Sequence, residues 1–354
     1  MDFSYGISVV MATYNTELSM LKEAVDSILD QTFKDFEFII IDDGSDNGSD
    51  VYLRSVRDGR VKIIYNPHNI GITKSLNIGF KHAKGKYIAR MDADDISVPT
   101  RFEKEYDYME RHPDVIVCGS ETAGVIDHTI VIDSKREHRP DNMEEYRVKL
   151  LFKNPGPIHP TAMIRHEPLI THNIMYDERL IHAQDYGLWE DLSHYGKIHV
   201  LKDILLYRRK HENQISVAKR EVQIDCDKMT QKKLLKALLG NVTDEEVNFH
   251  YVHSSGYFAD AVISPEAADW YDRLVRENEN RHVFHRKYLK KYIINAEKKL
   301  VIHSFRSDMT FGSKIKTIFK YIPLFPGLEM IVGHMIRLIM MKMRKAGKNK
   351  VITW

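Results

Sequence analysis

Apolar residues in the first third of the chain fall into short runs that alternate with amphipathic segments. The runs are rich in Val, Ile and Phe and predict strands at residues 7–12, 36–42, 61–65, 86–91 and 115–119. Apolar residues at helical spacing predict helices between them, at about 17–30, 72–83 and 98–111. Strands that alternate with helices in this way indicate βαβ units and an α/β fold with a mainly parallel central sheet.

The pattern changes after residue 118 and again near residue 217. The middle segment predicts strands at 129–133 and 160–165, helices at 141–152 and 183–196, and a strand, turn and strand at 197–209. From about residue 218 onward, long stretches have helical spacing. We therefore predict one domain over residues 1–217 and a helical C-terminal region over 218–354.

The composition is that of an ordinary globular protein, with 354 residues of which 43% are hydrophobic and 29% charged. These values exclude a disordered, collagen-like or disulfide-scaffold protein. The formal net charge of +2 does not favour binding of a polyanion by the whole molecule, so we expect no nucleic-acid partner. Cys118 and Cys226 have no metal-binding spacing, and neither a signal peptide nor an uncharged membrane-spanning run is visible. We expect a cytoplasmic protein.

Positive charge is concentrated at the C-terminus. Residues 311–354 contain nine Lys or Arg but a single acidic residue, Glu329. Within them, residues 328–350 are strongly apolar with interspersed basic residues, which is typical of a helix lying in the interface of an anionic membrane. The sequence thus predicts peripheral attachment at the inner face of the cytoplasmic membrane. Packing of this segment on the protein's own core or on a second subunit in an oligomer is the alternative.

Three polar clusters follow predicted strands, at residues 13–15, 42–45 and 92–95. In parallel sheets, ligands bind beyond the carboxyl ends of the strands, so the clusters predict a common site there. The alternative is that Asp, Asn, Gly and Ser serve only as turn formers.

The third cluster contains the triplet Asp92-Ala93-Asp94, followed by Asp95. Mg²⁺ commonly binds one or two carboxylates together with phosphate oxygens, and such an ion stabilises a diphosphate leaving group. Alternatively, Asp95 or Ser97 caps the helix predicted from residue 98.

These segments, taken in order, resemble family-two glycosyltransferases, which are inverting enzymes with the GT-A fold. The resemblance rests on "ISVVMATYN", "SILDQTFKDFEFIIIDDGSDNGS", "NIGITKSLNIGFKHAKGKYIARMDADD" and "RFEKEYDYMERHPDVIVCG". Later segments, "IHPTAMIR", "QDYGLW" and "YRRKHENQIS", resemble the acceptor half of bacterial members that build surface polysaccharides. The resemblance covers residues 6–217 and implies a Rossmann-like nucleotide-sugar domain, with a donor half over 1–118 and an acceptor half over 119–217.

The resemblance also implies roles in donor binding. Tyr14 would lie along the base or ribose, Asp43 would accept from N3–H of uracil or thymine, and Asp92 would contact the ribose. Asp94 would bind Mn²⁺ or Mg²⁺, and His211 would complete the metal shell or contact the diphosphate. Further candidates for the donor nucleotide site are Ala12, Asn69, Lys74, Asn77 and Arg90. For the last four, helix-surface charge and turn chemistry are the alternative explanations.

On the acceptor side, the resemblance implies that Asp185 is the catalytic base, which inverting transfer requires. Here Gln184 precedes it, where the family often has Glu, and Asp191 is an alternative base. His159 and Trp189 are candidates for binding the acceptor, although the spacing of Trp189 also suits a core position. The expected acceptor is a saccharide, free or carried on a polyprenyl lipid.

The leading hypothesis is a metal-dependent inverting glycosyltransferase, with a UDP-sugar as the expected donor. One alternative is a phosphatase or phosphomutase with an aspartate nucleophile, although its DxD motif would normally follow the first strand and here follows the fourth. Another is a non-catalytic nucleotide-sugar-binding protein. A dehydrogenase is disfavoured, since no GxGxxG follows the first strand.

Overall fold

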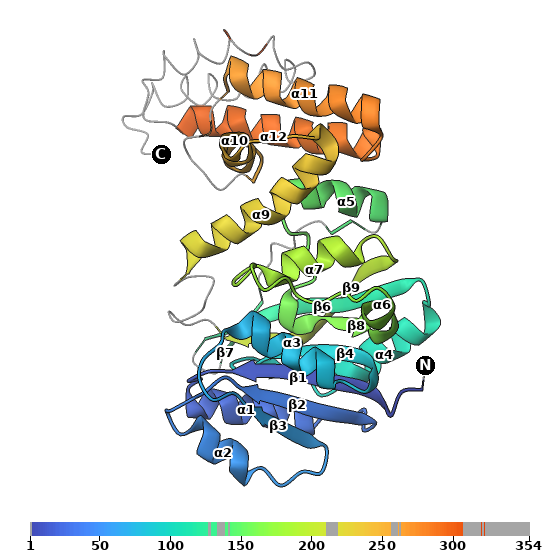
Figure 1. The fold of residues 1–354 in the computed structure, drawn as a ribbon, viewed down its shortest axis with the longest axis vertical. Helices are drawn as coiled ribbons and strands as arrows, with labels where there is room; N and C mark the ends of the chain where they lie inside the picture. The colour runs from blue at the N-terminus through green and yellow to red at the C-terminus, as the bar shows by residue number, and fades with distance from the viewer. Residues whose placement is uncertain are drawn as a thin grey trace, which may run out of the picture. The chain divides into compact units, whose positions relative to one another are not determined.

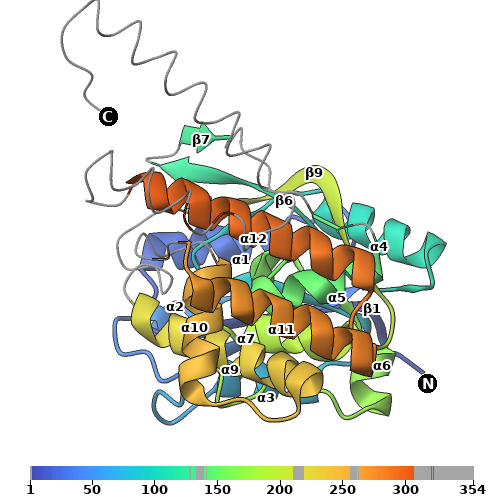
Figure 2. The same cartoon turned by 90° about the horizontal axis from the view of Figure 1, so that it is seen from above.

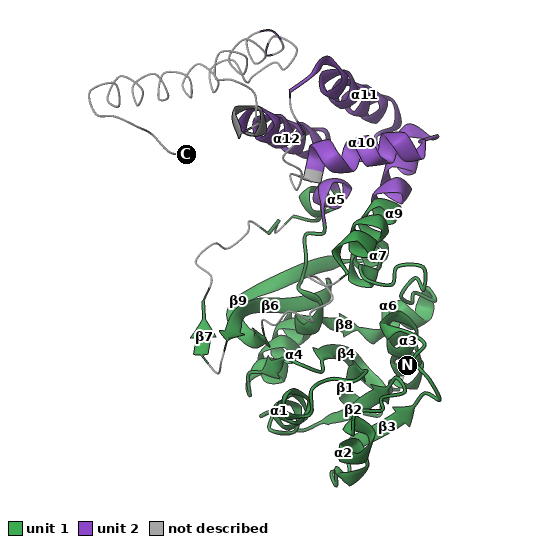
Figure 3. Ribbon diagram, turned by 90° about the vertical axis from the view of Figure 1, so that its left-hand side faces the viewer, with its two compact units in different colours: residues 1–147, 154–230 green, residues 148–153, 231–354 purple. Residues whose placement is uncertain are grey.

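The computed structural model describes residues 2–126, 129–132, 139–140, 142–209, 219–255, 261, 263–306, 320 and 322. The chain forms two compact units, shown in Figure 3: unit 1 is residues 1–147 with 154–230, and unit 2 is residues 148–153 with 231–354. The predicted domain boundary at residue 217 stays a prediction. His211 and the basic tail over 328–350 lie outside the described residues.

A single sheet forms the centre of the described part of unit 1, with the strand order β3-β2-β1-β4-β8-β6-β9-β5 and β7 paired to β6. Its strands are β1 (Tyr5–Thr13), β2 (Phe36–Asp42), β3 (Val61–Tyr65), β4 (Gly85–Asp92), β5 (Ile96–Ser97), β6 (Val115–Ile126), β7 (Thr129–Val131), β8 (Met163–Arg165) and β9 (Lys197–Arg209). The long pairings, β1 with β2 and β4, β2 with β3, and β6 with β9, are parallel. The shorter pairings are antiparallel. The predicted mainly parallel α/β sheet is therefore confirmed.

Helices cover both faces of this sheet. Figure 3 shows α1 and α4 on one side and α3 and α6 on the other. The described part of unit 1 contains the helices α1 (Leu18–Leu29), α2 (Ser49–Ser55), α3 (Ile72–His82), α4 (Arg101–Arg111), α6 (His166–Thr171) and α7 (Gln184–Leu192). It also contains the 3-10 turn η1 (His159–Thr161). Successive strand residues point to opposite faces, so Val9 and Met11 pack in the core under α1 and α4. Val10 points the other way, where a Cβ on Gly79 of α3 would lie 2.4 Å from its Cγ1.

Most predicted elements lie where the sequence pattern places them, and β2 and β3 have the predicted bounds. The helix predicted from residue 98 begins at Arg101, because Pro99 lies in a turn closed by the Arg101 N–H on the Val98 carbonyl. The segment 160–165, predicted as a strand, is a 3-10 turn followed by the short β8. Residues 197–209 form the single strand β9, whose pairing with β6 contains register shifts.

Helices make up the regular structure described in unit 2, which confirms the predicted helical C-terminal region. The helices are α10 (Asp244–Ser255), α11 (Pro265–Arg281) and α12 (Arg286–Arg306). Two others cross the unit boundary, α5 (Met143–Phe152) and α9 (Arg220–Leu239). Figures 1 and 2 show α11 and α12 side by side.

Buried His250 of α10 bonds to α5 and to α11. Its Nε2 lies 2.8 Å from the Leu151 carbonyl, and Trp270 Nε1–H donates to its Nδ1 at 3.1 Å. Burial lowers its pKa to about 4, so the ring is neutral and bonds through both nitrogens.

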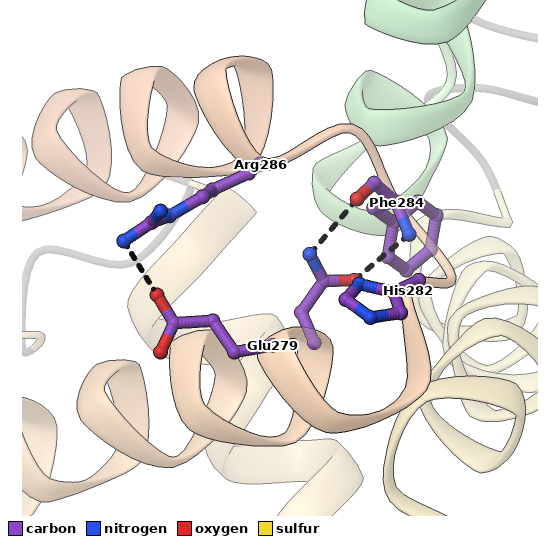
Figure 4. Close-up of a pocket in the computed structure, with 5 residues that line it drawn as sticks. Glu279, His282, Phe284 and Arg286 are labelled. Atoms are coloured by element: carbon purple, nitrogen blue, oxygen red, sulfur yellow. Dashed lines mark hydrogen bonds and ion pairs between the residues drawn. The ribbon is translucent and has the colours of Figure 1, made fainter.

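A pocket of about 370 Å³ opens at the turn between α11 and α12. Figure 4 shows its lining, in which Glu279 forms an ion pair with Arg286 at 2.9 Å. The Asn278 side chain donates to the Phe284 carbonyl and accepts from the Phe284 N–H, each at 2.8 Å, so it closes the turn. Among the described residues, no helix is both long and apolar enough to cross a membrane.

Candidate active site

The carboxyl ends of β1, β2 and β4 meet at one edge of the sheet. In the parallel register, Thr13 lies opposite Asp42 and Ala12 lies opposite Asp92. The segments after the first two strands also bond one another, since the backbone N–H of Asn15 donates to Ser45 Oγ at 3.0 Å. The three polar clusters therefore lie at the same edge of the sheet, where the sequence predicts a common site.

At the end of β4, Asp92, Asp94 and Asp95 each offer a carboxylate oxygen, and these oxygens lie within 4.8 Å of one another. Asp92 and Asp94 are half-buried, whereas Asp95 is buried. Burial raises the pKa of Asp95 well above its ordinary value, and the charges of Asp92 and Asp94 add to this effect. Three clustered carboxylates are mutually repulsive, so a bound divalent cation would stabilise them.

Asp95 and Ser97 do not cap the helix that follows them. Asp95 accepts from the Arg209 N–H at 3.1 Å and so ties the end of β4 to β9. Ser97 Oγ accepts from Gln31 Nε2 at 3.1 Å, and Thr100, which precedes α4, makes no side-chain cap. The capping alternative is therefore wrong, and the Asp95 side chain instead bonds the turn after β4 to the backbone of β9.

The donor set suits a hard cation such as Mn²⁺ or Mg²⁺. It consists of carboxylate oxygens alone among the described residues, and these ions prefer such ligands. One oxygen of Asp92 is held by Arg90, whose Nη2 lies 2.5 Å from Oδ1. The second oxygen of Asp92 and the carboxylate of half-buried Asp94 are thus placed to serve as ligands.

Arg90 lies beneath this cluster. It is fully buried in β4, and its Nε and Nη1 have no hydrogen-bond partner among the described residues. Its guanidinium orients Asp92 through Nη2, and its charge lowers the pKa of His159. Direct contact between Arg90 and a donor nucleotide stays a prediction.

The residues predicted to bind the nucleotide differ in how far their side chains are exposed to solvent. Tyr14, Asn69 and Lys74 are exposed, and Ala12 is half-buried. Asp43 is buried, and its carboxylate accepts from Asn66 Nδ2 at 2.8 Å and from the backbone N–H groups of Ile70 and Gly71. This carboxylate holds the loop between β3 and α3, and its predicted bond to the base would add to these three.

The predicted base, Asp185, lies in the first turn of α7, where Asn154 Nδ2 donates to its Oδ2 at 2.9 Å. Burial is the main cause that raises the pKa of this carboxyl above its ordinary value, and the charge of Asp92 raises it further. The bond from Asn154 and nearby backbone N–H groups oppose the rise. Asp191, the alternative base, is at the other end of α7.

His159 and Trp189 lie together near the base. His159 Nε2 is 2.7 Å from the Tyr176 hydroxyl, and burial together with the charge of Arg90 lowers its pKa well below the ordinary value. Trp189 is fully buried and donates from Nε1 to the Pro157 carbonyl at 3.2 Å, which supports the core alternative for it. A role of His159 in acceptor binding stays a prediction.

Sequence reasoning missed Asn154 and Tyr176. Asn154 precedes "PGP", a turn-forming segment that signals an ordered loop but not its partner. The sequence around Tyr176 gives no indication of its position. Its backbone carbonyl accepts from the Asn77 amide nitrogen and its backbone N–H donates to the Asn77 amide oxygen, at 3.0 Å each.

Comparison with known proteins identifies the relatives of this chain. The family description "Glycosyl transferase family 2" matches residues 8–172. An uncharacterized glycosyltransferase of Methanocaldococcus jannaschii is 34% identical over 222 residues, which are 61% of this chain and 75% of the relative. An uncharacterized glycosyltransferase of Haemophilus influenzae is 30% identical over 252 residues, 67% of this chain and 75% of the relative.

Solved structures of similar fold include TarS of S. aureus, residues 1–349, in complex with UDP-GlcNAc. Its TM-score is 0.55 at 17% identity, over 85% of this chain and 91% of that one. The mannosyltransferase PcManGT of Pyrobaculum calidifontis, in complex with GDP-Man and Mn²⁺, has a TM-score of 0.52 at 14% identity, over 84% and 88%. At these identities the likeness shows the GT-A fold alone.

Proposed function

The chain belongs to glycosyl transferase family 2, and we propose that it transfers a sugar from a nucleotide-sugar donor to an acceptor hydroxyl with inversion, in a metal-dependent reaction. The observation that carries the proposal is the site itself. A carboxylate cluster that suits a divalent cation lies at the carboxyl edge of the sheet, and the charge of Asp92 acts on a second, separate carboxyl, Asp185.

The donor is a nucleotide sugar, and we expect a UDP-sugar that carries a hexose or an N-acetylhexosamine. Support comes from the nucleotide sugars bound by proteins of the same fold. In this chain, exposed Tyr14 would lie along the base or ribose, and the Asp43 carboxylate would bind the base.

Asp94 and Asp92, together with His211, would hold Mn²⁺ or Mg²⁺. When bound, the ion neutralises the diphosphate and so stabilises it as a leaving group. Arg90 keeps Asp92 in place through its bond to Oδ1.

Asp185 would accept the proton of the acceptor hydroxyl as that oxygen attacks the anomeric carbon. A base must be ionised before it can accept a proton, and Asn154 and the first turn of α7 favour its ionised form. The expected acceptor is a saccharide or a polyprenyl-linked saccharide of surface polysaccharide synthesis, in agreement with a basic tail that would contact an anionic membrane.

Family membership argues against the aspartate-nucleophile phosphatase. The non-catalytic alternative is tested by turnover. UDP-, GDP- and dTDP-sugars are titrated with Mn²⁺ while the melting temperature is followed, because a ligand bound only by the native state raises stability. Donors that stabilise the protein are then assayed for transfer to saccharides and for slow hydrolysis. Stabilisation by a nucleotide sugar without any turnover would favour the non-catalytic binding protein.

A further inference from the structure

We infer that Asn154 is a positioning residue that reserves one oxygen of Asp185 as a hydrogen-bond acceptor, so that the other oxygen receives the proton in the transfer reaction. The inference deepens the proposed function and rests on it for the identity of the base. It is carried by the hydrogen bonds of the loop between α5 and η1.

The orientation of the Asn154 amide follows from its two partners. Its Oδ1 accepts from the Gly156 N–H at 2.9 Å, so its Nδ2 must face Asp185 Oδ2, also at 2.9 Å. The reversed amide would place an oxygen against the carboxylate and would leave the Gly156 N–H facing an NH₂ group. Asp185 Oδ2 therefore has a fixed donor, and this arrangement requires it to act as an acceptor.

The loop that carries Asn154 is fastened on several sides. The Tyr146 hydroxyl of α5 donates to the Gly156 carbonyl at 2.5 Å, and Trp189 of α7 donates to the Pro157 carbonyl. A Cβ on Gly119 of β6 would lie 2.4 Å from Pro157 Cβ, so the loop packs closely on the sheet. Because the loop is bonded to the same helix that carries Asp185, the amide is held in a constant position beside the base.

Gly156 is required for this loop conformation. Its φ of +84° is rarely adopted by other residues, and an added Cβ would meet Arg139 Nη1 at 2.7 Å. Arg139 is itself paired with Glu121 of β6 at 3.3 Å. The sequence thus favours the backbone conformation in which the Gly156 N–H points toward Asn154, because glycine adopts this φ readily.

The proton transfer that follows is simple to balance. The acceptor O–H bond breaks, its oxygen forms the bond to the anomeric carbon, and the bond from that carbon to the nucleotide diphosphate breaks. The proton goes to Oδ1 of Asp185, because the bond from Asn154 makes Oδ2 the less basic of the two oxygens. The carboxyl that results keeps the bond from Asn154.

The ionisable groups that act on Asp185 come from three parts of unit 1. Asp92 of β4 raises its pKa, and the Asp185 charge in turn raises the pKa values of Tyr146 of α5 and of Tyr176 in the loop after α6. Burial raises both tyrosine values well above 10, so both hydroxyls stay neutral near pH 7. The charges of Arg139 and Arg90 lower the pKa values of Tyr146 and Tyr176, respectively, and so oppose the effect of Asp185. Asp92 is the charged neighbour that raises the pKa of Asp185.

The test uses the full-length protein with Asn154→Ala, which removes the donor, and Asn154→Asp, which keeps the shape but places a second carboxylate against Asp185. Asn278→Ala is the matched control, since that asparagine also uses both the nitrogen and the oxygen of its amide but bonds the Phe284 backbone. The pKa of Asp185 is measured by carboxyl ¹³C NMR, with the resonance assigned by its absence in Asp185→Asn. We expect it to rise in Asn154→Ala, to rise further in Asn154→Asp and to stay unchanged in Asn278→Ala.

The second measurement is turnover of the stabilising nucleotide sugar across pH. We expect kcat to fall roughly 10- to 100-fold in Asn154→Ala, the range typical for a partner that orients a functional group, with donor KM unchanged and the acid limb moved to higher pH. An unchanged Asp185 pKa in folded Asn154→Ala would overturn the inference whatever the enzyme's activity. Absence of donor binding in the wild type would refute the proposed function while leaving the NMR result to decide on Asn154.

Discussion

Replacing Asp185 by Asn separates a catalytic role of this carboxyl from a structural one. Asn keeps the shape of the side chain and an oxygen that accepts from Asn154, but it cannot take a proton. A positioned general base contributes roughly 10²- to 10⁴-fold to rate, or about 3–5.5 kcal/mol of activation free energy. We therefore expect kcat to fall by that factor and the affinity for the donor to stay within roughly twofold of the wild type.

The stability of this variant is expected to move differently. A bond from Asn154 to a charged acceptor is worth about 1 kcal/mol more than one to a neutral acceptor, which would favour the wild type. Burial opposes this, and since the net effect raises the pKa of Asp185, the folded protein favours the neutral form. A carboxyl with a raised folded pKa costs the native state stability as the pH rises from its unfolded pKa to its folded pKa, and the loss is complete above the folded pKa. At pH 7 the melting temperature of Asp185→Asn should accordingly equal or exceed that of the wild type.

The assay combines transfer kinetics, isothermal titration with the donor and Mn²⁺, and thermal unfolding of the same samples. Asp191→Asn, at the far end of α7, is the control. Turnover of Asp185→Asn within tenfold of the wild type would refute the assignment of the base. A large loss in Asp191→Asn instead would transfer the assignment to that residue. A lower melting temperature together with weaker donor binding would show that Asp185 is structural.

Three further predictions concern the metal, the helical unit and the tail. Asp94→Asn should weaken donor binding in the presence of Mn²⁺ by more than the roughly 10- to 100-fold that is typical when a partner of a metal ligand is lost. Donor binding without metal should stay the same. An equal loss of affinity with and without Mn²⁺ in calorimetry would contradict the assignment of Asp94 as a metal ligand. Burial and, secondarily, the charge of Asp272 raise the pKa of Glu297 to about 7, so the native state loses stability as the pH rises from about 4.5 to 7. Glu297→Gln should then raise stability at pH 8 by roughly 3 kcal/mol at most and leave it unchanged at pH 4, which urea unfolding at both pH values would test. The full-length protein should sediment with anionic vesicles but not with neutral ones, and deletion of residues 326–354 should abolish the sedimentation with anionic vesicles. Undiminished sedimentation of the deletion variant would exclude the tail as the membrane contact.

The strands at the centre of the fold are predictable because they are buried on both faces. The run from Phe36 to Asp42 has no exposed residue, and its continuous apolar character makes its bounds clear from sequence alone. The second half of β6 contains Glu121 and Thr122, and these polar residues hide a strand that continues to Ile126. The short helices α2 and α6 were not predicted, since one or two turns give too few apolar repeats to reveal a helical period.

The candidate site could be predicted in part for a similar reason. Its donor side consists of residues directly after strands, where position along the chain implies position in space. On the acceptor side, Asn154 and Asp185 are 31 residues apart and belong to a loop and a helix. No periodicity connects them, and only the folded chain shows that they are partners.

The roles of the three aspartates after β4 follow from their burial and their partners. Asp92 is oriented by a buried arginine, Asp95 is bonded to the backbone of β9, and Asp94 remains half-buried at the edge of the sheet. The carboxylates of Asp92 and Asp95 are thus held by hydrogen bonds within the protein, which fixes their positions before any ion binds. A cation bound at this edge would meet these carboxylates already in place, so part of the cost of bringing like charges together would be met in folding and not in binding. The role proposed for Asn154 separates tasks in the same way, since it bonds one oxygen of Asp185 and would leave the other for the acceptor.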